Sequence, residues 1–253
     1  MSPIYAYLTH LGRRLCAAPA PRALDYGCGA GQLIEAANAV GFACVGVDTF
    51  FEGGSYREVA RKKGLLNTVI LELRDGRIPQ ADGSFDIVFA NQVFEHIDDF
   101  SLPLHEIDRV LKADGLFLNA FPTRDVWREG HCGIPFLHRF PKGSRFPRYY
   151  YALAMRALGF GFNTEGTSRS KWTQNMLTWL DNWTFYKSRA EVGIAFAPYF
   201  DLEMFDADYF AYRLEKSGSL RFAAKVMRWR YLRPVAAFLT RKLAGHIFVM
   251  RKR

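Results

Sequence analysis

The stretch Leu24-Asp25-Tyr26-Gly27-Cys28-Gly29-Ala30-Gly31 runs from a short apolar segment into three glycines at alternate positions. The next residues, 32–39 (QLIEAANA), favour a helix, and Gly41 is placed to end it. The glycines therefore occupy a turn from a strand into a helix. Because glycine accepts positive φ angles and has no Cβ, such a turn lets a ligand touch the main chain. The pattern favours a nucleotide-type cofactor.

The spacing of these glycines is Gly-x-Gly-x-Gly. It differs from the dinucleotide fingerprint Gly-x-Gly-x-x-Gly, in which a pyrophosphate lies on the helix N-terminus. Asp25 lies two residues before the first glycine, where a carboxylate suits a cationic ligand better than a pyrophosphate. A turn of this kind can also be purely structural, so its interpretation depends on the segments further along the chain.

Further apolar segments come in the order expected of a parallel α/β sheet. Residues 42–47 (FACVGV) predict a second buried strand. It ends in Asp48, roughly 20 residues beyond the first glycine, where an acidic side chain can hold both ribose hydroxyls. Residues 69–73 and 84–90 predict a third and a fourth strand, and residues 116–121 a fifth.

Three blocks of this region resemble the class I S-adenosylmethionine-dependent methyltransferases, and in particular their type 11 domain. The glycine turn with Asp25 resembles motif I of that family. Residues 91–97 (NQVFEHI) resemble the segment after its fourth strand, and residues 109–115 (RVLKADG) resemble its approach to strand five. The resemblance is close over about residues 20–122. It implies S-adenosyl-L-methionine as the cofactor and S-adenosyl-L-homocysteine as the product.

The resemblance also implies the fold class, α/β, with a Rossmann-like seven-stranded sheet that is parallel except for one antiparallel terminal strand. Residues 1–253 would form a single methyltransferase domain. A lid would be inserted after strand five over residues 124–190, and a basic helical addition before the last strand over residues 213–243. The remaining expected helices cover residues 3–17, 149–158, 171–180 and 190–200, and the last two strands cover 200–205 and 245–251.

The residues that would hold the cofactor are carried over from the same resemblance. Phe50 and Phe51 would form an apolar wall for the adenine, although such a pair is as often part of a core. Asp75 lies where the family places an acidic acceptor for the adenine amino group, but Arg74 takes that position if no gap is assumed. The expected cofactor-binding residues are Asp25, Gly27, Cys28, Gly29, Gly31, Asp48, Thr49, Phe50, Asp75, Gly76, Asn91, Gln92 and Val93.

The segment after strand five is rich in Gly, Pro, His, Arg and aromatic residues, which predicts a structured loop. Ligands of open α/β sheets bind beyond the carboxyl ends of the strands, so this loop is expected to cover the methyl group and exclude water. His131 is the first candidate for a catalytic base and Glu129 the second, but both can equally serve to rigidify the loop. His96 is expected to tie down its helix rather than to act as a base.

Metal binding is not expected from the sequence. His131, Cys132 and His138 match no common zinc spacing, and no other Cys or His cluster completes four ligands. The four cysteines lack paired spacing, which fits reduced thiols. The chain has no run of 18 apolar residues and no signal-peptide pattern. A cytoplasmic location is therefore expected.

Positive charge is concentrated in two segments. Residues 124–190 contain 11 Lys and Arg against 4 Asp and Glu, and residues 213–253 contain 12 against 1. Because these segments carry +7 and +11 of a net charge of +9, the rest of the chain carries −9. An anionic substrate is one explanation, and a merely solvated surface is another. The basic helical region with Trp229 and Tyr231 could also lie on an anionic membrane at its inner face.

These observations favour a methyltransferase that acts on an oxygen atom of a small, or glycan- or lipid-linked, anionic acceptor. Asn91-Gln92-Val93-Phe94 replaces the Asn-Pro-Pro-Tyr-like signature that clamps an amino group, which argues against methylation of nucleobases. RNA methylation stays open as an alternative because the basic segments could track phosphates, although no RNA-binding module is appended. A non-catalytic binding protein with the same fold is the other alternative.

Overall fold

The computed structural model describes residues 2–51 and 56–253. Seven strands form one sheet in the order β3-β2-β1-β4-β5-β7-β6. β7 is antiparallel to both of its neighbours, and the other neighbouring strands run parallel. The predicted fold class is therefore confirmed. The strands are β1 (Arg22–Tyr26), β2 (Ala43–Asp48), β3 (Ile70–Glu72), β4 (Phe85–Asn91), β5 (Leu111–Phe121), β6 (Phe200–Met204) and β7 (His246–Lys252).

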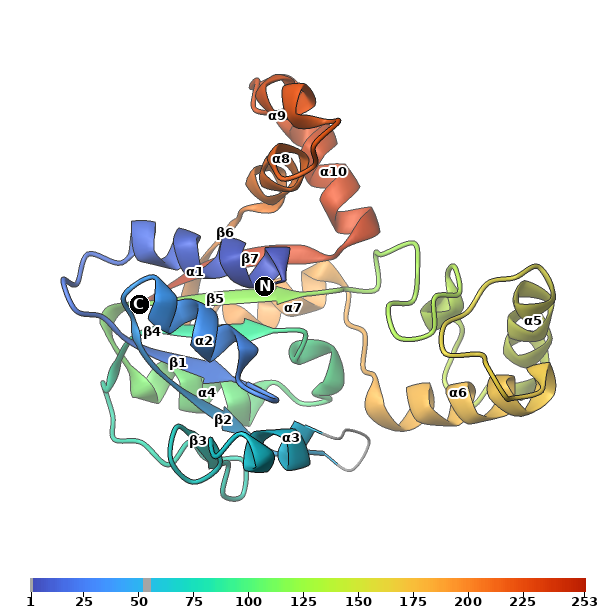
Figure 1. Cartoon of the computed structure of the whole chain (residues 1–253), viewed down its shortest axis with the longest axis horizontal. Coiled ribbons are helices and arrows are strands. Elements are labelled where there is room, and N and C mark those ends of the chain that lie inside the picture. Colours follow the sequence, from blue (N-terminus) through green and yellow to red (C-terminus); the bar gives the residue numbers. More distant parts are fainter. Residues whose placement is uncertain (1, 52–55) are drawn as a thin grey trace.

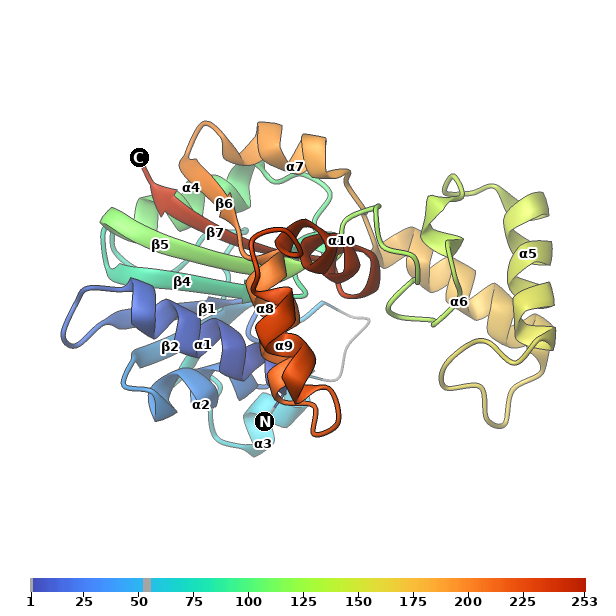
Figure 2. The ribbon, with the colours of Figure 1, turned by 90° about the horizontal axis from the view of Figure 1, so that it is seen from above.

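Helices cover both faces of this sheet (Figures 1 and 2). α1 (Pro3–Leu15) and α2 (Gln32–Ala39) pack on one face, where their apolar side chains form one buried cluster with β4 and β5. α4 (Ser101–Val110) and α7 (Arg189–Phe196) pack on the other face, over a second buried cluster rich in phenylalanine. α3 (Tyr56–Lys62) follows β2 and contributes Ala60 to the first cluster.

β5 begins at Leu111, five residues before the expected start of strand five. Leu111 pairs with Phe85, and the next paired residue is Leu116, which pairs with Ile87. The residues between them form an irregularity in which Asp114 has a φ of 59°. The RVLKADG segment therefore enters the sheet at Leu111, before Lys112 and Asp114, whose polar character had suggested a later start.

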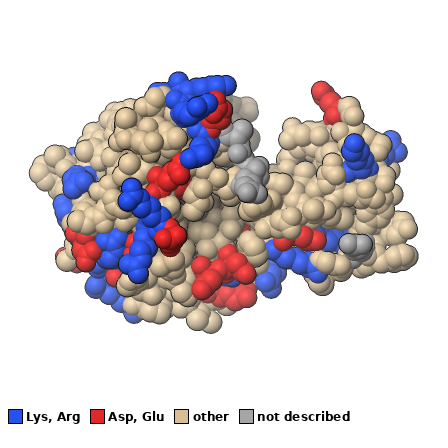
Figure 3. Space-filling view, turned by 90° about the horizontal axis from the view of Figure 1, so that it is seen from below, with Lys and Arg blue, Asp and Glu red and all other residues tan. Residues whose placement is uncertain are grey.

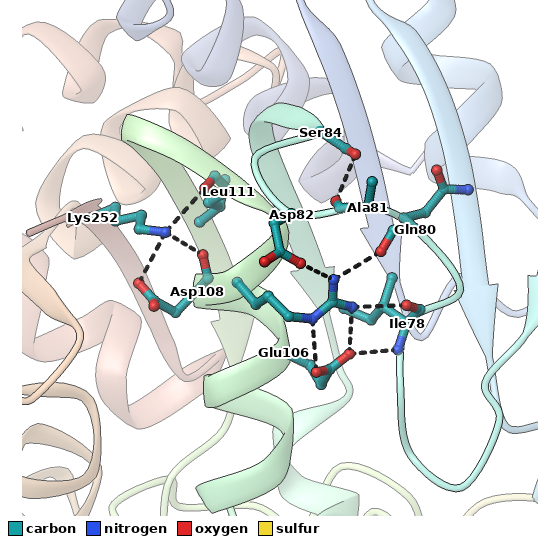
Figure 4. A network of polar contacts seen from close by, with 10 residues as sticks. Ile78, Gln80, Ala81, Asp82, Ser84, Glu106, Asp108, Leu111 and Lys252 are labelled. Carbon is teal, nitrogen blue, oxygen red and sulfur yellow. Dashed lines mark hydrogen bonds and ion pairs between the residues drawn. The ribbon is translucent and has the colours of Figure 1, made fainter.

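Arg109 of the same segment has a structural role (Figure 4). Its guanidinium donates to both carboxylate oxygens of Glu106, to Asp82, and to the carbonyls of Gln80 and Ile78. Glu106 is buried and also accepts from the Ile78 amide. Hydrogen bonds from Arg109 therefore hold the pKa of Glu106 below its usual value despite its burial. This network fixes the loop between β3 and β4 against α4.

The segment after β5 forms a lobe that extends away from the sheet, and we call residues 123–188 the lid (Figure 1). It contains α5 (Arg145–Ala157), α6 (Arg169–Trp183) and the short 3-10 helix η2 (Leu137–Arg139). These elements share a small buried cluster of their own, which consists of Cys132, Ile134, Leu137, Ala152, Trp172 and Leu180. The lid ends where Ser188 and Glu191 form a capping box at the start of α7.

Three helices between β6 and β7 form a second addition (Figure 2). They are α8 (Asp206–Glu215), α9 (Arg221–Met227) and α10 (Arg233–Leu243). Pro234 lies in the first turn of α10, where proline is tolerated because its missing amide hydrogen is not needed, so it separates two helices rather than kinking one. Asp206 joins this addition to the sheet by accepting from the Ile247 amide and contacting His246.

Candidate cofactor and acceptor site

The glycine turn connects β1 to α2 at the carboxyl end of the sheet. Gly27, Gly29 and Gly31 have φ angles of 74°, 52° and 81°. A Cβ on Gly27 would lie 2.4 Å from Cγ2 of Val93, so the turn must pass this side chain without one. A Cβ on Gly29 would instead point toward the ring of Tyr56, at 3.4 Å. The turn thus needs glycine for its backbone angles and for the close approach of β1 to the segment after β4.

Asp48, at the end of β2, accepts hydrogen bonds from the turn. Its Oδ2 accepts from the Gly29 amide at 2.7 Å, and its Oδ1 accepts from the Phe50 amide at 2.6 Å. Burial raises the pKa of Asp48, although these backbone hydrogen bonds oppose that shift. Each carboxylate oxygen has a further lone pair, so Asp48 can accept from ligand hydroxyls as well.

A cavity of about 710 Å³ lies beside this turn. It is bounded by the glycine turn, the ends of β2 and β4, helix α1 and the lid. The Asn91 Oδ1 atom is buried here with no hydrogen-bond partner among the described residues, so it is available to a ligand. The cavity-lining residues are Tyr5, Tyr26, Gly27, Cys28, Gly29, Gln32, Asp48, Thr49, Phe50, Phe51, Tyr56, Leu73, Asn91, Gln92, Val93, His96, Ile97, His131, Trp179 and Trp183.

Most of the expected cofactor-binding residues lie on this cavity. Those that line it are Gly27, Cys28, Gly29, Asp48, Thr49, Phe50, Asn91, Gln92 and Val93. Four others lie outside its lining: Asp25, Gly31, Asp75 and Gly76.

The four residues outside the lining lie inside a strand, before a helix, or in a turn. Asp25 is buried within β1, and burial together with the nearby Asp48 raises its pKa well above the usual range. Gly31 precedes α2, and Leu65 and Ile70 surround it. Asp75 and Gly76 form a turn between Arg74 and Arg77. Leu73, two residues earlier, reaches the cavity in place of Asp75.

Several lining residues could not be selected from the motifs. Tyr5 comes from α1, and Trp179 and Trp183 come from the end of α6, almost 90 residues beyond β4. In the structure, Trp183 lies 5.1 Å from Phe51 and Trp179 lies 5.0 Å from His131, measured between ring centroids. These contacts bring the lid against the turn after β2.

Glu129 and His131 lie next to each other at the lid side of the cavity. His131 Nδ1 is 2.7 Å from Glu129 Oε1, which also accepts from the Tyr186 hydroxyl at 2.6 Å. The other oxygen of Glu129 accepts from the Cys132 amide. Burial alone would raise the pKa of Glu129, but the hydrogen bonds from His131 and Tyr186 bring it down to about 2. Glu129 is 0% exposed and does not line the cavity, whereas His131 does.

A second buried carboxylate, Glu95, belongs to the 3-10 helix η1 (Phe94–His96) after β4. It is 1% exposed, and neither carboxylate oxygen has a hydrogen-bond partner among the described residues. Burial and the nearby Glu129 raise the pKa of Glu95 to about 8. The adjacent His96 binds the Trp183 carbonyl through Nδ1 at 2.5 Å, and burial lowers its pKa. This bond ties His96 to the lid rather than to its own helix.

A separate cavity of about 470 Å³ lies between the lid and α7. Cationic side chains outnumber anionic ones in its lining: Arg124, Arg139, Lys142, Arg148 and Lys187 against Asp98 and Glu191. Arg148 is only 4% exposed and pairs with Asp181. Residues 184–187 line this second cavity, whereas Trp183 lines the first.

Comparison with known proteins matches residues 24–119 to the family model described as "Methyltransferase domain". The segment spans β1 to β5, the strands that build the glycine turn, Asp48 and the segment after β4. Residues 24–119 therefore correspond to a class I S-adenosylmethionine-dependent methyltransferase domain. The cofactor that this family implies is the expected one, S-adenosylmethionine.

Curated relatives share the methyltransferase domain over part of their length. An uncharacterized methyltransferase, YcgJ of Bacillus subtilis, is 35% identical over 98 residues, 38% of this chain and 39% of the relative. A ubiquinone biosynthesis O-methyltransferase of Bradyrhizobium sp. is 35% identical over 109 residues, 42% of each protein. The chain thus spans about two fifths of the length of these relatives.

The fold extends further than the sequence similarity. An S-adenosylmethionine-dependent methyltransferase from Mesorhizobium loti superposes with a TM-score of 0.53 at 14% identity, over 100% of this chain and 98% of that one. At this identity the likeness concerns the fold.

The residues present fit S-adenosylmethionine. Glycine main chain and the Asp48 carboxylate border the cavity, and the Asn91 oxygen there lacks a partner among the described residues. Phe50, Phe51 and Leu73 provide apolar surface for an adenine ring. Asp25 lies buried beneath the turn, where a cationic ligand group would offset the cost of its ionisation.

Proposed function

We propose that the chain transfers a methyl group from S-adenosylmethionine to an oxygen atom of an anionic acceptor. The supporting observation is that one cavity is lined both by the cofactor elements of the methyltransferase domain and by His131, Trp179 and Trp183 of the lid. When bound, S-adenosylmethionine supplies a methyl group already activated by a sulfonium. The protein then contributes mainly alignment of the two reactants and exclusion of water.

His131 is the residue through which the lid acts on the acceptor. Because its Nδ1 faces the Glu129 carboxylate, the proton of the neutral ring belongs on Nδ1 and the lone pair on Nε2. Nε2 can take the proton of an acceptor hydroxyl while the oxygen–carbon bond forms and the sulfur–carbon bond breaks. Glu129 and Tyr186 do not line the main cavity of about 710 Å³, so we assign them as positioning residues that fix this tautomer.

The basic second cavity supports an anionic acceptor. Its five Lys and Arg side chains face two acidic ones, and the Nε atom of the buried Arg148 has no partner among the described residues. The ubiquinone biosynthesis O-methyltransferases among the relatives support oxygen as the methylated atom. A glycan- or lipid-linked anion would combine both features.

The exposed face of the C-terminal helices supports contact with an anionic membrane. Phe222, Trp229 and Tyr231 are 87%, 60% and 62% exposed, and Arg221, Lys225 and Arg230 accompany them in sequence. Aromatic and basic side chains together suit the membrane interface. Among the helices of residues 2–51 and 56–253, none has the length and apolarity needed to cross a bilayer.

RNA is the weaker alternative acceptor. On the face shown in Figure 3, blue and red side chains are interspersed over the core, and the lid at the right is mostly uncharged. A phosphate backbone would favour a continuous basic stripe instead. The mixed surface therefore gives no support to an RNA track on that face.

Two measurements, made one after the other, test the proposal. Calorimetry with S-adenosylhomocysteine should show one binding site per chain; no binding would favour a non-catalytic role. Transfer of labelled methyl from S-adenosylmethionine should then be measured on phenols, sugar nucleotides, lipid-linked glycans and total RNA. We expect label in an ether or ester of one of the first three classes. Label in RNA alone would overturn the proposed acceptor class.

A further inference from the structure

Three potential metal ligands meet where the lid touches the core. Glu95 and His96 belong to η1 after β4, and His131 belongs to the lid. One potential ligand atom of each side chain lies within 4.8 Å of the other two. The imidazole rings of His96 and His131 are 5.0 Å apart between centroids. These two residues are 35 positions apart in the sequence, so their spacing matches no sequence pattern for a metal site.

Glu95 supplies the observation that points to a missing partner. Both of its carboxylate oxygens are buried and lack a hydrogen-bond partner among the described residues. A buried polar group left unpaired costs about 1–3 kcal/mol, and more when it is charged. The nearby carboxylate of Glu129 repels a negative charge on Glu95. A cation between Glu95 and the two imidazoles would remove this cost.

Both histidines are held in the tautomer that a metal ion requires. His96 directs Nδ1 at the Trp183 carbonyl, which can only accept, so its Nε2 atom bears the free lone pair. His131 directs Nδ1 at Glu129, with the same result. A carboxylate or carbonyl behind each ligating histidine is the usual arrangement around bound metals. Glu129 and Tyr186 would thus orient one ligand, and the Trp183 carbonyl the other.

We propose that Glu95, His96 and His131 bind one divalent transition-metal ion, such as Zn²⁺ or Mn²⁺, between the lid and the methyltransferase core. Two imidazole nitrogens and one carboxylate suit these ions better than Mg²⁺ or Ca²⁺, which prefer oxygen ligands. Ligand atoms of a tetrahedral zinc lie roughly 3.3–3.6 Å apart, given metal–ligand distances of about 2.0–2.2 Å. Since the three candidate ligand atoms already lie within 4.8 Å of one another, only small side-chain movements separate them from this geometry.

Three protein ligands leave coordination positions open, and His96 and His131 line the main cavity. If the proposed function holds, an acceptor oxygen takes an open position, and the ion rather than His131 lowers the pKa of the acceptor hydroxyl. The acceptor class then narrows to hydroxyl compounds that can ligate a metal. Binding of the ion itself does not depend on the proposed function.

The full chain, stripped of metal with a chelator, provides the test. We expect calorimetry to show one high-affinity Zn²⁺ per chain, and Co²⁺ to give visible absorption bands of a low-coordinate nitrogen and oxygen site. Glu95→Gln and His131→Gln should each weaken Zn²⁺ binding by more than about 100-fold, since loss of an outer partner alone costs about 10–100-fold. Glu129→Gln and Tyr186→Phe should fall within that smaller range.

Matched controls separate this site from adventitious binding. His105 and Glu165 are exposed and lie outside the cluster, so His105→Gln and Glu165→Gln should bind Zn²⁺ as the wild type does. Thermal unfolding establishes that each variant is folded. The metal site would be overturned if the wild type bound no stoichiometric Zn²⁺. It would also be overturned if Glu95→Gln and His131→Gln bound Zn²⁺ as tightly as the wild type does.

Binding of S-adenosylhomocysteine, measured on the same samples, distinguishes the two proposals. A protein that binds S-adenosylhomocysteine but no metal refutes only the metal site. A protein that binds Zn²⁺ through Glu95 and His131 but binds no S-adenosylhomocysteine refutes the proposed function and leaves the metal site intact.

Discussion

The methyltransferase core and the lid are built on different scales. The core packs two large apolar clusters on the faces of a seven-stranded sheet, whereas the lid encloses one cluster of six buried residues. Polar contacts that join them include the Phe185 amide, which donates to the Glu95 carbonyl, and His96, which contacts the Trp183 carbonyl. The lid thus packs around its own small cluster and can differ in sequence without disturbing the sheet.

The largest expected effect comes from the lid. His131→Gln removes the ring that faces the cavity, so turnover should fall by about 10²–10⁴-fold, the usual contribution of a positioned base. Affinity for S-adenosylhomocysteine should stay unchanged, because the glycine turn and Asp48 belong to the core. Single-turnover methyl transfer together with calorimetry measures both. If the substitution lowered cofactor affinity as much as turnover, the assignment of cofactor binding to the core and of proton removal to the lid would be refuted.

The core should show the opposite response. Gly29→Val places a branched side chain toward Tyr56 and the cavity, so affinity for S-adenosylhomocysteine should fall by about 100-fold or more. Gly64→Val is the matched control, since Gly64 also has a positive φ, 70°, but a Cβ added there would meet no described atom within 4 Å. Both variants carry the strain of a left-handed backbone, about 1–2 kcal/mol. Equal affinity in the two variants would argue against this cavity as the cofactor site.

Asp48 tests a single contact within the core. Asp48→Ala should weaken S-adenosylhomocysteine binding by about 1.5–3 kcal/mol, the range for hydrogen bonds to a charged group. Asp86→Ala is the control, because Asp86 also accepts from a backbone amide, that of Arg22, but lies outside the cavity lining. Calorimetry at one ionic strength compares them, and an equal loss in both would indicate a general effect on the sheet.

The two buried carboxylates at the junction should give opposite pH dependences of stability. The pKa of Glu95 is about 8 in the folded protein and 4.5 for a free side chain, so the unfolded chain loses this proton first as pH rises. In metal-free protein the free energy of unfolding should therefore fall between pH 4.5 and 8, by up to about 1.4 kcal/mol per pH unit from this group. Glu95→Gln should flatten that part of the profile.

Glu129 has the reverse sign. Its pKa is about 2 in the folded protein, so its contribution to stability is present above pH 4.5 and is lost as pH falls toward 2. Glu129→Gln should remove the acid-side loss. Because Glu129 also raises the pKa of Glu95, the substitution should narrow the fall above pH 4.5 without abolishing it, since burial is the larger cause. Denaturant unfolding across this range measures both variants, and identical profiles would show that the two carboxylates share one environment.

The sequence predicted the core better than the junction, for a physical reason. The glycine turn, Asp48 and the segment after β4 are local patterns, and parallel strands bring their carboxyl ends together whatever the rest of the chain does. Glu129 and His131 were also selected, because they lie two residues apart in a polar loop. Tyr186 and Glu95, which complete their surroundings, come from distant segments that only lid packing brings close.

The differences between the expected and observed elements also have local causes. The basic addition expected over residues 213–243 is divided into separate helices: α9 ends at Met227, and Pro234 lies in the first turn of α10. α8 was not predicted, since its apolar positions follow β6 without a clear boundary. Asp75 stays a prediction: it lies in a turn outside the cavity lining, whereas Leu73, two residues earlier, lines the cavity.

Residues 183–187 form a partition: Trp183 faces one cavity, and Tyr186 faces the other while its hydroxyl contacts Glu129. A molecule with its charged end among Lys142 and Arg148 could present a hydroxyl to His131 only by reaching past this partition. Its length, measured from charge to hydroxyl, would then decide whether it is methylated. Under the proposed function, the width of this one peptide segment would therefore set the minimum length of an acceptor that is methylated.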